Sequence, residues 1–396
     1  MIYKKMSQSN STYLASKPRY EILDGLRGVA AMIVVIYHLF EDFGLGVAVQ
    51  GANHGYLAVD FFFVLSGFVI GYAYDDRWDR MSYADFFKRR LIRLHPMVIF
   101  GAFLGMLMFY FTSGGPFGLV DGTEWYNLVL VFLVACTMIP LGAGSDIRGW
   151  GETYPLNGPC WSLMLEYIAN ILYAFVIRHL GKIALGVLVG IFALLTINHG
   201  MCIDVYNAIP DNWYAKYTFI GGWGIEGVQL HIAITRLLYP FFCGLLISRV
   251  GKFIKVQGGF WWASLLIAVM LLMPRVGGNV PENFWMNGLY ETICVLIGFP
   301  LVVMIGAGSK VTGQKSVAVC DFLGKISFPL YITHYIFIYL HISWISSHPD
   351  APLGTCIMVS ASVFIISVML AYAALKLYDE PVREWLKNKL FTKKVK

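Results

Sequence analysis

Long apolar runs separated by short polar connections make up most of the chain. Eleven such runs can be read at residues 23–43, 56–74, 91–112, 126–141, 160–178, 183–199, 231–249, 259–274, 287–306, 327–345 and 355–377. Several of them approach the roughly 20 residues that a helix needs to cross a bilayer. The pattern therefore predicts an all-α fold, a polytopic bundle of transmembrane helices.

The positions of the basic residues indicate which runs cross the membrane. Lys and Arg cluster in the N-terminal tail and at residues 77–93, 178–182, 249–255, 310–315 and 376–396. Basic loops prefer the cytoplasmic side, and all of these clusters fall there only if run 126–141 does not cross. We therefore expect about ten transmembrane helices with both termini cytoplasmic. Segment 126–141 would be re-entrant, interfacial or packed inside the bundle, and it is a candidate lining of a cavity; the alternative is a short tilted span.

The composition agrees with a membrane protein and argues against several kinds of binding site. The chain is 58% hydrophobic and 14% charged, whereas soluble domains carry about 25% charged residues. Its net charge of +6 is explained by basic residues that orient the chain in the membrane and attract anionic lipid, and it does not indicate nucleic-acid binding. Seven cysteines without a CxxC pair argue against a disulfide framework or a zinc site.

The expected organisation is a single membrane domain with two tails. Residues 1–20 form a polar, basic cytoplasmic tail without a cleavable signal, residues 21–378 the membrane domain, and residues 379–396 a basic tail on the inner surface. The longest external connection, 200–230, carries Trp213, Tyr214, Tyr217 and Trp223. These aromatics either cap a site and stack on a sugar ring or form an ordinary aromatic belt.

Two ionisable residues in the first run, Arg27 and His38, are separated by eleven positions. On an α-helix this separation is about 20° beyond three full turns and about 16 Å of rise, so both side chains share one face. Charged groups at membrane depth are costly, which favours a functional pair. Taken alone, Arg27 could snorkel to the surface and His38 could be a hydrogen-bonded histidine of the bundle.

Further candidates occur in the third and fifth runs. Arg90 and Arg93 are neighbours on one helix face, at a predicted helix start where guanidinium groups and free backbone N–H groups would suit phosphates. The alternative is a purely topological role. Glu166 follows Trp161 and Ser162 at the outer start of the fifth run. A carboxylate there is either catalytic or held in a structural pair with Arg or His.

Two other segments carry weaker signals. His334 lies in the tenth run, which we expect to open near Ser327, and is either a cavity group or a buried histidine. Ser66 and Gly67 in the second run predict close helix packing.

Together these segments resemble the acyltransferase type 3 family of integral-membrane acyltransferases. The resemblance rests on five motifs: Arg27-x10-His38, Phe61-Phe-Phe-Val-Leu-Ser-Gly-Phe68, Arg90-x-x-Arg93, Trp161-Ser-Leu-x-x-Glu166 and Gly324-Lys-Ile-Ser-x-x-Leu-Tyr-x-x-His334. The chain departs from the family at Pro329 and Thr333, where Ser and Trp are frequent. The resemblance implies transfer of an acyl group, most often acetyl, from cytoplasmic acyl-CoA to a hydroxyl of a carbohydrate such as a surface polysaccharide.

The resemblance also implies a cellular setting. We expect a multi-pass protein of the cell inner membrane, with acetyl-CoA as a co-substrate and no permanently bound cofactor or metal. Some family members carry a fused SGNH-type domain after the last span. Here 18 residues follow position 378, so any such contribution is expected from a separate periplasmic or membrane partner, or not at all.

The expected mechanism assigns each candidate a role. Arg27, Arg90 and Arg93 bind the nucleotide end of acyl-CoA, and the thioester reaches His38. His38 is the general base, since its ordinary pKa of about 6.5 leaves a neutral ring, or it is a nucleophile that forms an acyl-histidine. The expected catalytic and orienting groups are completed by Glu166, Glu41, Asp42, Trp161, Ser162 and His334.

Two other classes of function fit a polar-lined bundle. A transporter or flippase for a small polar or glycan substrate also places ionisable residues inside spans. Against it, no inverted repeat is visible and the arginines cluster at one side. The second class is a non-catalytic membrane partner of other machinery. Acyl-CoA hydrolysis or transfer by purified protein distinguishes the enzyme from both.

Overall fold

The chain folds as helices joined by short connections in a computed structural model that describes residues 17–41, 43, 50–211 and 216–391. The predicted all-α class is confirmed, because no strand longer than an isolated bridge occurs among these residues. The α-helices are α1 Glu21–Glu41, α2 Ala58–Tyr74, α3 Tyr83–Met108, α4 Trp125–Ala135, α5 Cys160–Phe175, α6 Lys182–Gly200, α7 Gly227–Val250, α8 Gly259–Leu272, α9 Phe284–Ile293, α10 Phe299–Gly308, α11 Gln314–Ser347, α12 Leu353–Ala374 and α13 Glu380–Phe391.

Eight helical segments of the described chain are long and apolar enough to cross a membrane. They comprise α1, α2, α3, α6, α7, α11, the α9–α10 pair and the continuous α12–α13 pair. Helices α4, α5 and α8 are shorter. The 11 residues of α4 span about 16 Å, roughly half of the hydrocarbon core, which agrees with a non-crossing 126–141 segment. The total of ten crossings, with α5 and α8 included, and the cytoplasmic termini stay predictions.

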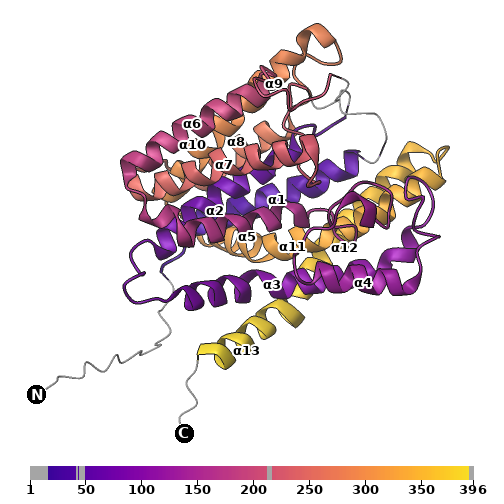
Figure 1. Cartoon of the computed structure of the whole chain (residues 1–396), viewed down its shortest axis with the longest axis horizontal. Helices are drawn as coiled ribbons and strands as arrows, with labels where there is room; N and C mark the ends of the chain where they lie inside the picture. The colour runs from indigo at the N-terminus through magenta and orange to yellow at the C-terminus, as the bar shows by residue number, and fades with distance from the viewer. Residues whose placement is uncertain (1–16, 42, 44–49, 212–215, 392–396) are drawn as a thin grey trace, which may run out of the picture.

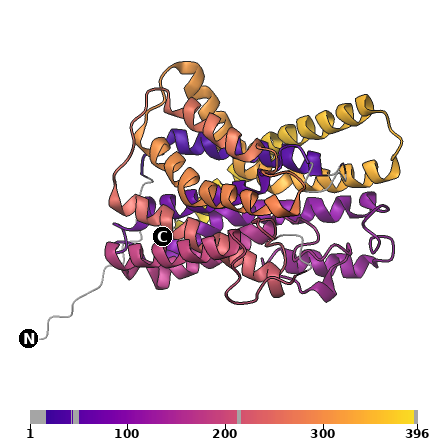
Figure 2. The ribbon, with the colours of Figure 1, turned by 90° about the horizontal axis from the view of Figure 1, so that it is seen from above.

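Helices α1 and α11 lie in the middle of the bundle and make their most extensive contacts with each other. In Figure 1, helices α6 to α10 lie above this pair, and α3 and α4 lie below it; Figure 2 shows the same bundle from above. Helix α2 packs chiefly on α7. Helices α1 and α11 are thus neighbours although about two thirds of the chain lies between them in the sequence.

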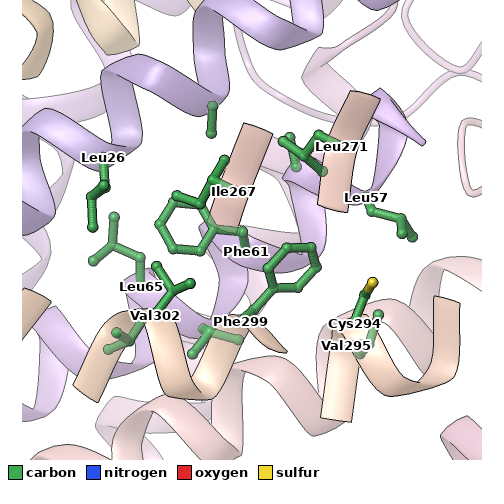
Figure 3. Close-up of a cluster of buried hydrophobic side chains, with 14 of the residues drawn as sticks. Leu26, Leu57, Phe61, Leu65, Ile267, Leu271, Cys294, Val295, Phe299 and Val302 are labelled. Atoms are coloured by element: carbon green, nitrogen blue, oxygen red, sulfur yellow. The ribbon is translucent and has the colours of Figure 1, made fainter. Parts of the chain in front are cut away.

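An apolar core fixes the position of α1. Figure 3 shows Leu26 of α1 near side chains of α2, α8 and α10, among them Phe61, Ile267 and Phe299. These four side chains are fully buried. The packing on this side leaves the opposite face of α1 for α11 and for the cavities described below.

Glycines allow the closest helix contacts. A Cβ on Gly67 of α2 would lie 1.9 Å from the carbonyl oxygen of Phe241 in α7, and one on Gly244 of α7 would lie 1.9 Å from that of Val64. A Cβ added to Gly28 of α1 would lie 2.4 Å from the carbonyl oxygen of Leu323 in α11. The close packing predicted at Gly67 is therefore confirmed. Ser66 instead donates a hydrogen bond to Glu166.

Gly67→Ala should lower the stability of the protein, because the added methyl group forces α2 and α7 apart. Overpacking of this kind costs about 1–3 kcal/mol, which should appear as a lower unfolding temperature in detergent. The matched control is Gly186→Ala in α6, where nothing lies within 4 Å of the added Cβ. Equal unfolding temperatures for the two variants would contradict the assignment of Gly67 as a packing position.

Two predicted helix starts are wrong. Helix α3 begins at Tyr83, where the Ser82 hydroxyl accepts a hydrogen bond from the backbone N–H of Asp85, so Arg90 and Arg93 lie in the helix interior. Their backbone N–H groups are therefore not free for a phosphate. Helix α11 begins at Gln314 and contains Pro329 in its interior. In both cases the helix extends beyond the apolar run, because hydropathy marks burial in the membrane and not the helix end.

Candidate functional site

Two adjoining cavities lie inside the bundle. The arginine cavity has a volume of about 110 Å³, and its polar lining residues are Arg27, Ser66, Arg90, Arg93, Ser162, Glu166, Ser327 and Tyr331. The histidine cavity has a volume of about 460 Å³, and its polar and aromatic lining residues are Tyr37, His38, Glu41, Tyr56, Trp150, Glu152, Trp161, Trp223, Arg236, Tyr331 and Tyr335. Val59 and Tyr331 line both cavities. Arg27 and His38 thus open into neighbouring cavities and not into one.

The boundary between the cavities is formed by the start of α5 and the middle of α11. Trp161 lines the histidine cavity, whereas the next residue, Ser162, lines the arginine cavity. The Ser162 and Tyr331 hydroxyls are hydrogen-bonded at 2.6 Å. The Trp-Ser pair predicted as a substrate or orienting element therefore lies where a molecule in one cavity would meet a molecule in the other.

Arg27 links α1 to α11 while its side chain lines the arginine cavity. Its Nε donates to the Ser327 hydroxyl at 2.7 Å, and its Nη2 donates to the Gly324 carbonyl at 3.0 Å. Asp24 lies 3.3 Å from the same Nη2. Residues of the first and fifth sequence motifs thus contact each other directly.

Arg90 and Arg93 differ in how their charge is balanced. Arg90 Nη2 forms an ion pair with Glu166 Oε1 at 2.5 Å. Arg93 has neither an ion-pair partner nor a hydrogen bond among the described residues. The like charges of Arg27, Arg383 and Arg90 repel it, and the carboxylates of Asp24 and Asp379 attract it from a greater distance. The cavity therefore carries an excess of positive charge, which would stabilise a bound anion.

Glu166 lies in the arginine cavity and not with His38. Its Oε1 accepts hydrogen bonds from Arg90 and Ser66. This is the structural Glu–Arg pair that the sequence leaves open as the alternative to catalysis. Glu166 does not line the histidine cavity, so it has no contact through which it could orient the His38 ring.

His38 is paired with a carboxylate of its own helix. Its Nδ1–H donates to Glu41 Oε2 at 2.8 Å, and Tyr37 donates to the other oxygen at 3.4 Å. A carboxylate only accepts, so this bond places the proton on Nδ1 and leaves Nε2 as a proton acceptor. Glu41 therefore stands where the sequence predicts an orienting group. Asp42 lies outside the described residues.

His334 is fully buried and lines neither cavity. Its Nδ1 contacts the carbonyls of Leu330 and Tyr331, each at 3.0 Å. Its ring centroid lies 5.6 Å from that of His38. His334 thus packs behind His38 on α11 rather than facing the cavity space.

The histidine cavity also contains charged residues that sequence reasoning missed. Glu152, in the connection between α4 and α5, is buried, and Tyr339 of α11 donates a hydrogen bond to its Oε2. Burial raises the pKa of Glu152 to about 7. Arg236 of α7 is also buried and forms an ion pair with Asp60 of α2 at 2.7 Å. The available signals were a carboxylate in a short Trp- and Gly-rich connection and opposite charges within two apolar runs.

The aromatic residues of the 200–230 connection divide between two positions. Trp223 lines the histidine cavity, which fits the predicted capping role. Tyr217 does not line it. Trp213 and Tyr214 lie outside the described residues. No group of three potential metal ligands occurs in the described part of the chain.

The fold and these cavities define a multi-pass membrane protein with a cationic cavity next to a histidine–carboxylate pair. The chain belongs to the acyltransferase type 3 family, whose profile, described as an acyltransferase domain, matches residues 20–373. The family predicted from the five motifs is thereby confirmed.

Individual relatives agree with this membership. The chain is 25% identical over 379 residues to the O-acetyltransferase OatA of Staphylococcus aureus, across 93% of this chain and 58% of OatA. It is 24% identical over 344 residues to the acyltransferase MdmB of Streptomyces mycarofaciens, across 81% of this chain and 79% of MdmB. Protein 2 in the picA locus of Rhizobium radiobacter is 33% identical over 163 residues, 39% of this chain and 81% of that protein. The chain thus spans less than two thirds of OatA. No solved structure matches the chain.

Proposed function

We propose that the protein is a membrane O-acyltransferase that transfers an acyl group, most simply acetyl, from cytoplasmic acyl-CoA to a hydroxyl of a carbohydrate such as a surface polysaccharide. The observation that supports this most directly is the pair of adjoining cavities. One offers uncompensated positive charge, the other offers a histidine held by a carboxylate, and they share Val59 and Tyr331.

The arginine cavity is the proposed donor site. Arg93, together with Arg27 and Arg90, binds the phosphates of acyl-CoA, because guanidinium groups pair well with phosphate oxygens. The rest of the lining is largely apolar and includes Phe62, Phe63 and Phe328, which suits a pantetheine chain. The thioester then reaches the Ser162–Tyr331 boundary.

The histidine cavity is the proposed acceptor site. His38 Nε2 accepts the proton of the acceptor hydroxyl as its oxygen attacks the thioester carbonyl, and Glu41 stabilises the resulting imidazolium. The C–S bond breaks, and the CoA thiolate takes up a proton. In the covalent route, His38 Nε2 itself attacks the thioester carbonyl, the C–S bond breaks and the CoA thiolate leaves. The acceptor hydroxyl then attacks the acyl-histidine, the N–acyl bond breaks, and the hydroxyl proton passes to the released imidazole.

The names of the relatives favour an enzyme over the transporter or flippase alternative, because OatA and MdmB are described as acyltransferases. The polysaccharide acceptor, the acetyl group and a separate partner protein are parts of the proposal that extend beyond these names.

Purified protein in detergent should cleave acetyl-CoA, and carbohydrate extracted from the cell envelope should accelerate the release of the CoA thiol. Mass spectrometry should find acetyl esters on surface glycans that disappear from cells lacking the protein. Heat-inactivated protein is the control. If the active protein neither cleaves acetyl-CoA nor changes glycan acetylation, the proposed function is wrong.

A further inference from the structure

We propose that Glu152 selects the acceptor: it accepts a hydrogen bond from a second hydroxyl of an uncharged polyol ring and repels acceptors that carry an anionic group near the reacting hydroxyl. This inference rests on the proposed function, since it takes the histidine cavity as the acceptor site. Glu152 would thereby determine specificity in a step separate from the proton transfer at His38.

The turn that carries Glu152 is held rigidly by a neighbouring carboxylate. Asp146 accepts hydrogen bonds from the backbone N–H groups of Arg148 at 2.8 Å, Trp150 at 2.6 Å and Gly151 at 2.7 Å. These bonds fix the backbone immediately before Glu152. A binding group on a preorganised turn loses little conformational freedom when it meets its ligand.

The nearby cation does not neutralise Glu152 directly. Arg148 is 1% exposed, donates to the Pro155 carbonyl and the Thr112 hydroxyl, and stacks 3.7 Å from the centroid of the Tyr339 ring. Among the described residues, Tyr339 is the only hydrogen-bond partner of Glu152. The carboxylate of Glu152 is thus left without an ion pair among the described residues.

One oxygen of Glu152 is available to a ligand. Tyr339 occupies Oε2, whereas Oε1 has no hydrogen-bond partner within the described part of the chain, and Glu152 lines the histidine cavity. A carboxylate oxygen can only accept. A hydroxyl group of a molecule in the cavity is a donor that this oxygen can bind.

The charges of the cavity disfavour anions. Glu41 is a second carboxylate in the same lining. The cation of Arg236 is compensated by Asp60 and also donates to the carbonyls of Gly221 and Tyr56. An acceptor with a carboxylate or phosphate would meet negative charge without a free cation to balance it.

Aromatic walls complete a site of suitable shape. Trp150, Trp161 and Trp223 line the cavity, and their flat apolar faces can pack on the C–H face of a sugar ring. Thr153, next to Glu152, donates from both its N–H and its hydroxyl to the Trp223 carbonyl at 3.0 and 2.6 Å. Glu152 and Trp223 are therefore held in one assembly.

The protonation state of Glu152 allows its role to be tested by a change of pH. The groups that face it are Tyr339 of α11, Arg148 and Asp146 of its own connection, and Glu41 of α1, while burial dominates and raises its pKa to about 7. Glu152 is thus mostly ionised at pH 8 and mostly protonated at pH 6. Repulsion of anions should weaken over this interval.

The test compares matched acceptors with purified protein and acetyl-CoA at pH 8. The probes are methyl glucoside, galactoside and mannoside, each paired with its uronic acid, and the readout is CoA release above the rate without acceptor. At least one neutral glycoside should exceed its uronic acid by about tenfold in kcat/KM, a typical effect of an unpaired charge. Glu152→Gln, whose amide oxygen still accepts from Tyr339, should bring this ratio close to one, and Glu152→Lys should reverse it.

The control is Glu282→Gln, since Glu282 is exposed and lines neither cavity, and it should keep the wild-type ratio. For the wild type the ratio should be smaller at pH 6 than at pH 8, and any change in rate that is common to both acceptors cancels in this ratio. A ratio unchanged in Glu152→Gln, equal use of the uronic acids, or acetyl-CoA cleavage that no neutral glycoside stimulates would overturn the inference and leave the donor site standing. Absence of any acetyl-CoA cleavage by the wild type would instead contradict the proposed function, and the inference would fall with it.

Discussion

His38→Ala should lower kcat/KM for acyl transfer by about 10²–10⁴-fold, the usual contribution of a positioned general base. In the structure, His38 is the histidine whose ring lines the larger cavity, and its Nδ1 is already engaged by Glu41. Removal of the imidazole leaves no other histidine in that lining to accept the proton. The measurement is CoA release with acceptor present, normalised to the amount of folded protein in the membrane.

His179→Ala provides the control for the loss of a histidine, because His179 is exposed and lines neither cavity. It should retain wild-type kcat/KM. The same preparations separate the two chemical routes, since an acyl-histidine would appear as a labelled wild-type protein that His38→Ala lacks. Near wild-type transfer by His38→Ala would exclude both routes.

Arg93→Ala should raise the KM for acyl-CoA by about 10–100-fold, the loss of one or two charge-assisted hydrogen bonds to phosphate. The KM for the acceptor should stay the same, because Arg93 lines only the arginine cavity. The effect follows from the absence of a protein partner for Arg93 among the described residues, which leaves its guanidinium free for a ligand. Initial rates over a range of acetyl-CoA concentrations measure it.

Arg90→Ala is a less direct test, because it also leaves Glu166 without its ion-pair partner and should lower stability. Arg80→Ala is the control for Arg93→Ala, because it also removes one arginine. Arg80 is exposed, precedes α3 and lines neither cavity, so this variant should keep the wild-type donor KM. A donor KM that does not change in Arg93→Ala would rule out the assignment of the arginine cavity to phosphate.

Local periodicity was sufficient to predict the features that lie within one helix. The short separation between His38 and Glu41 places them one turn apart, and the structure joins them by a hydrogen bond. The His38–Glu41 prediction succeeded because neighbours on a helix are determined by spacing alone. That 126–141 does not cross stays a prediction from charge counting, with which the short α4 agrees.

Contacts between distant segments could not be predicted in this way. Arg90 and Glu166 are 76 residues apart, and only the packing of α3 against α5 brings them together. Glu152 was missed for a related reason. It belongs to a connection that hydropathy treats as surface, and it becomes buried because Tyr339, 187 residues later, lies over it.

The contact between α1 and α11 has a consequence for biosynthesis. Arg27 and Ser327 are 300 positions apart, and both line the arginine cavity. A ribosome must therefore deliver the eleventh helix to the bilayer before this cavity is complete. A nascent chain that stalls earlier lacks one wall of the cavity, so it should not consume the cell's thioester pool before synthesis is finished.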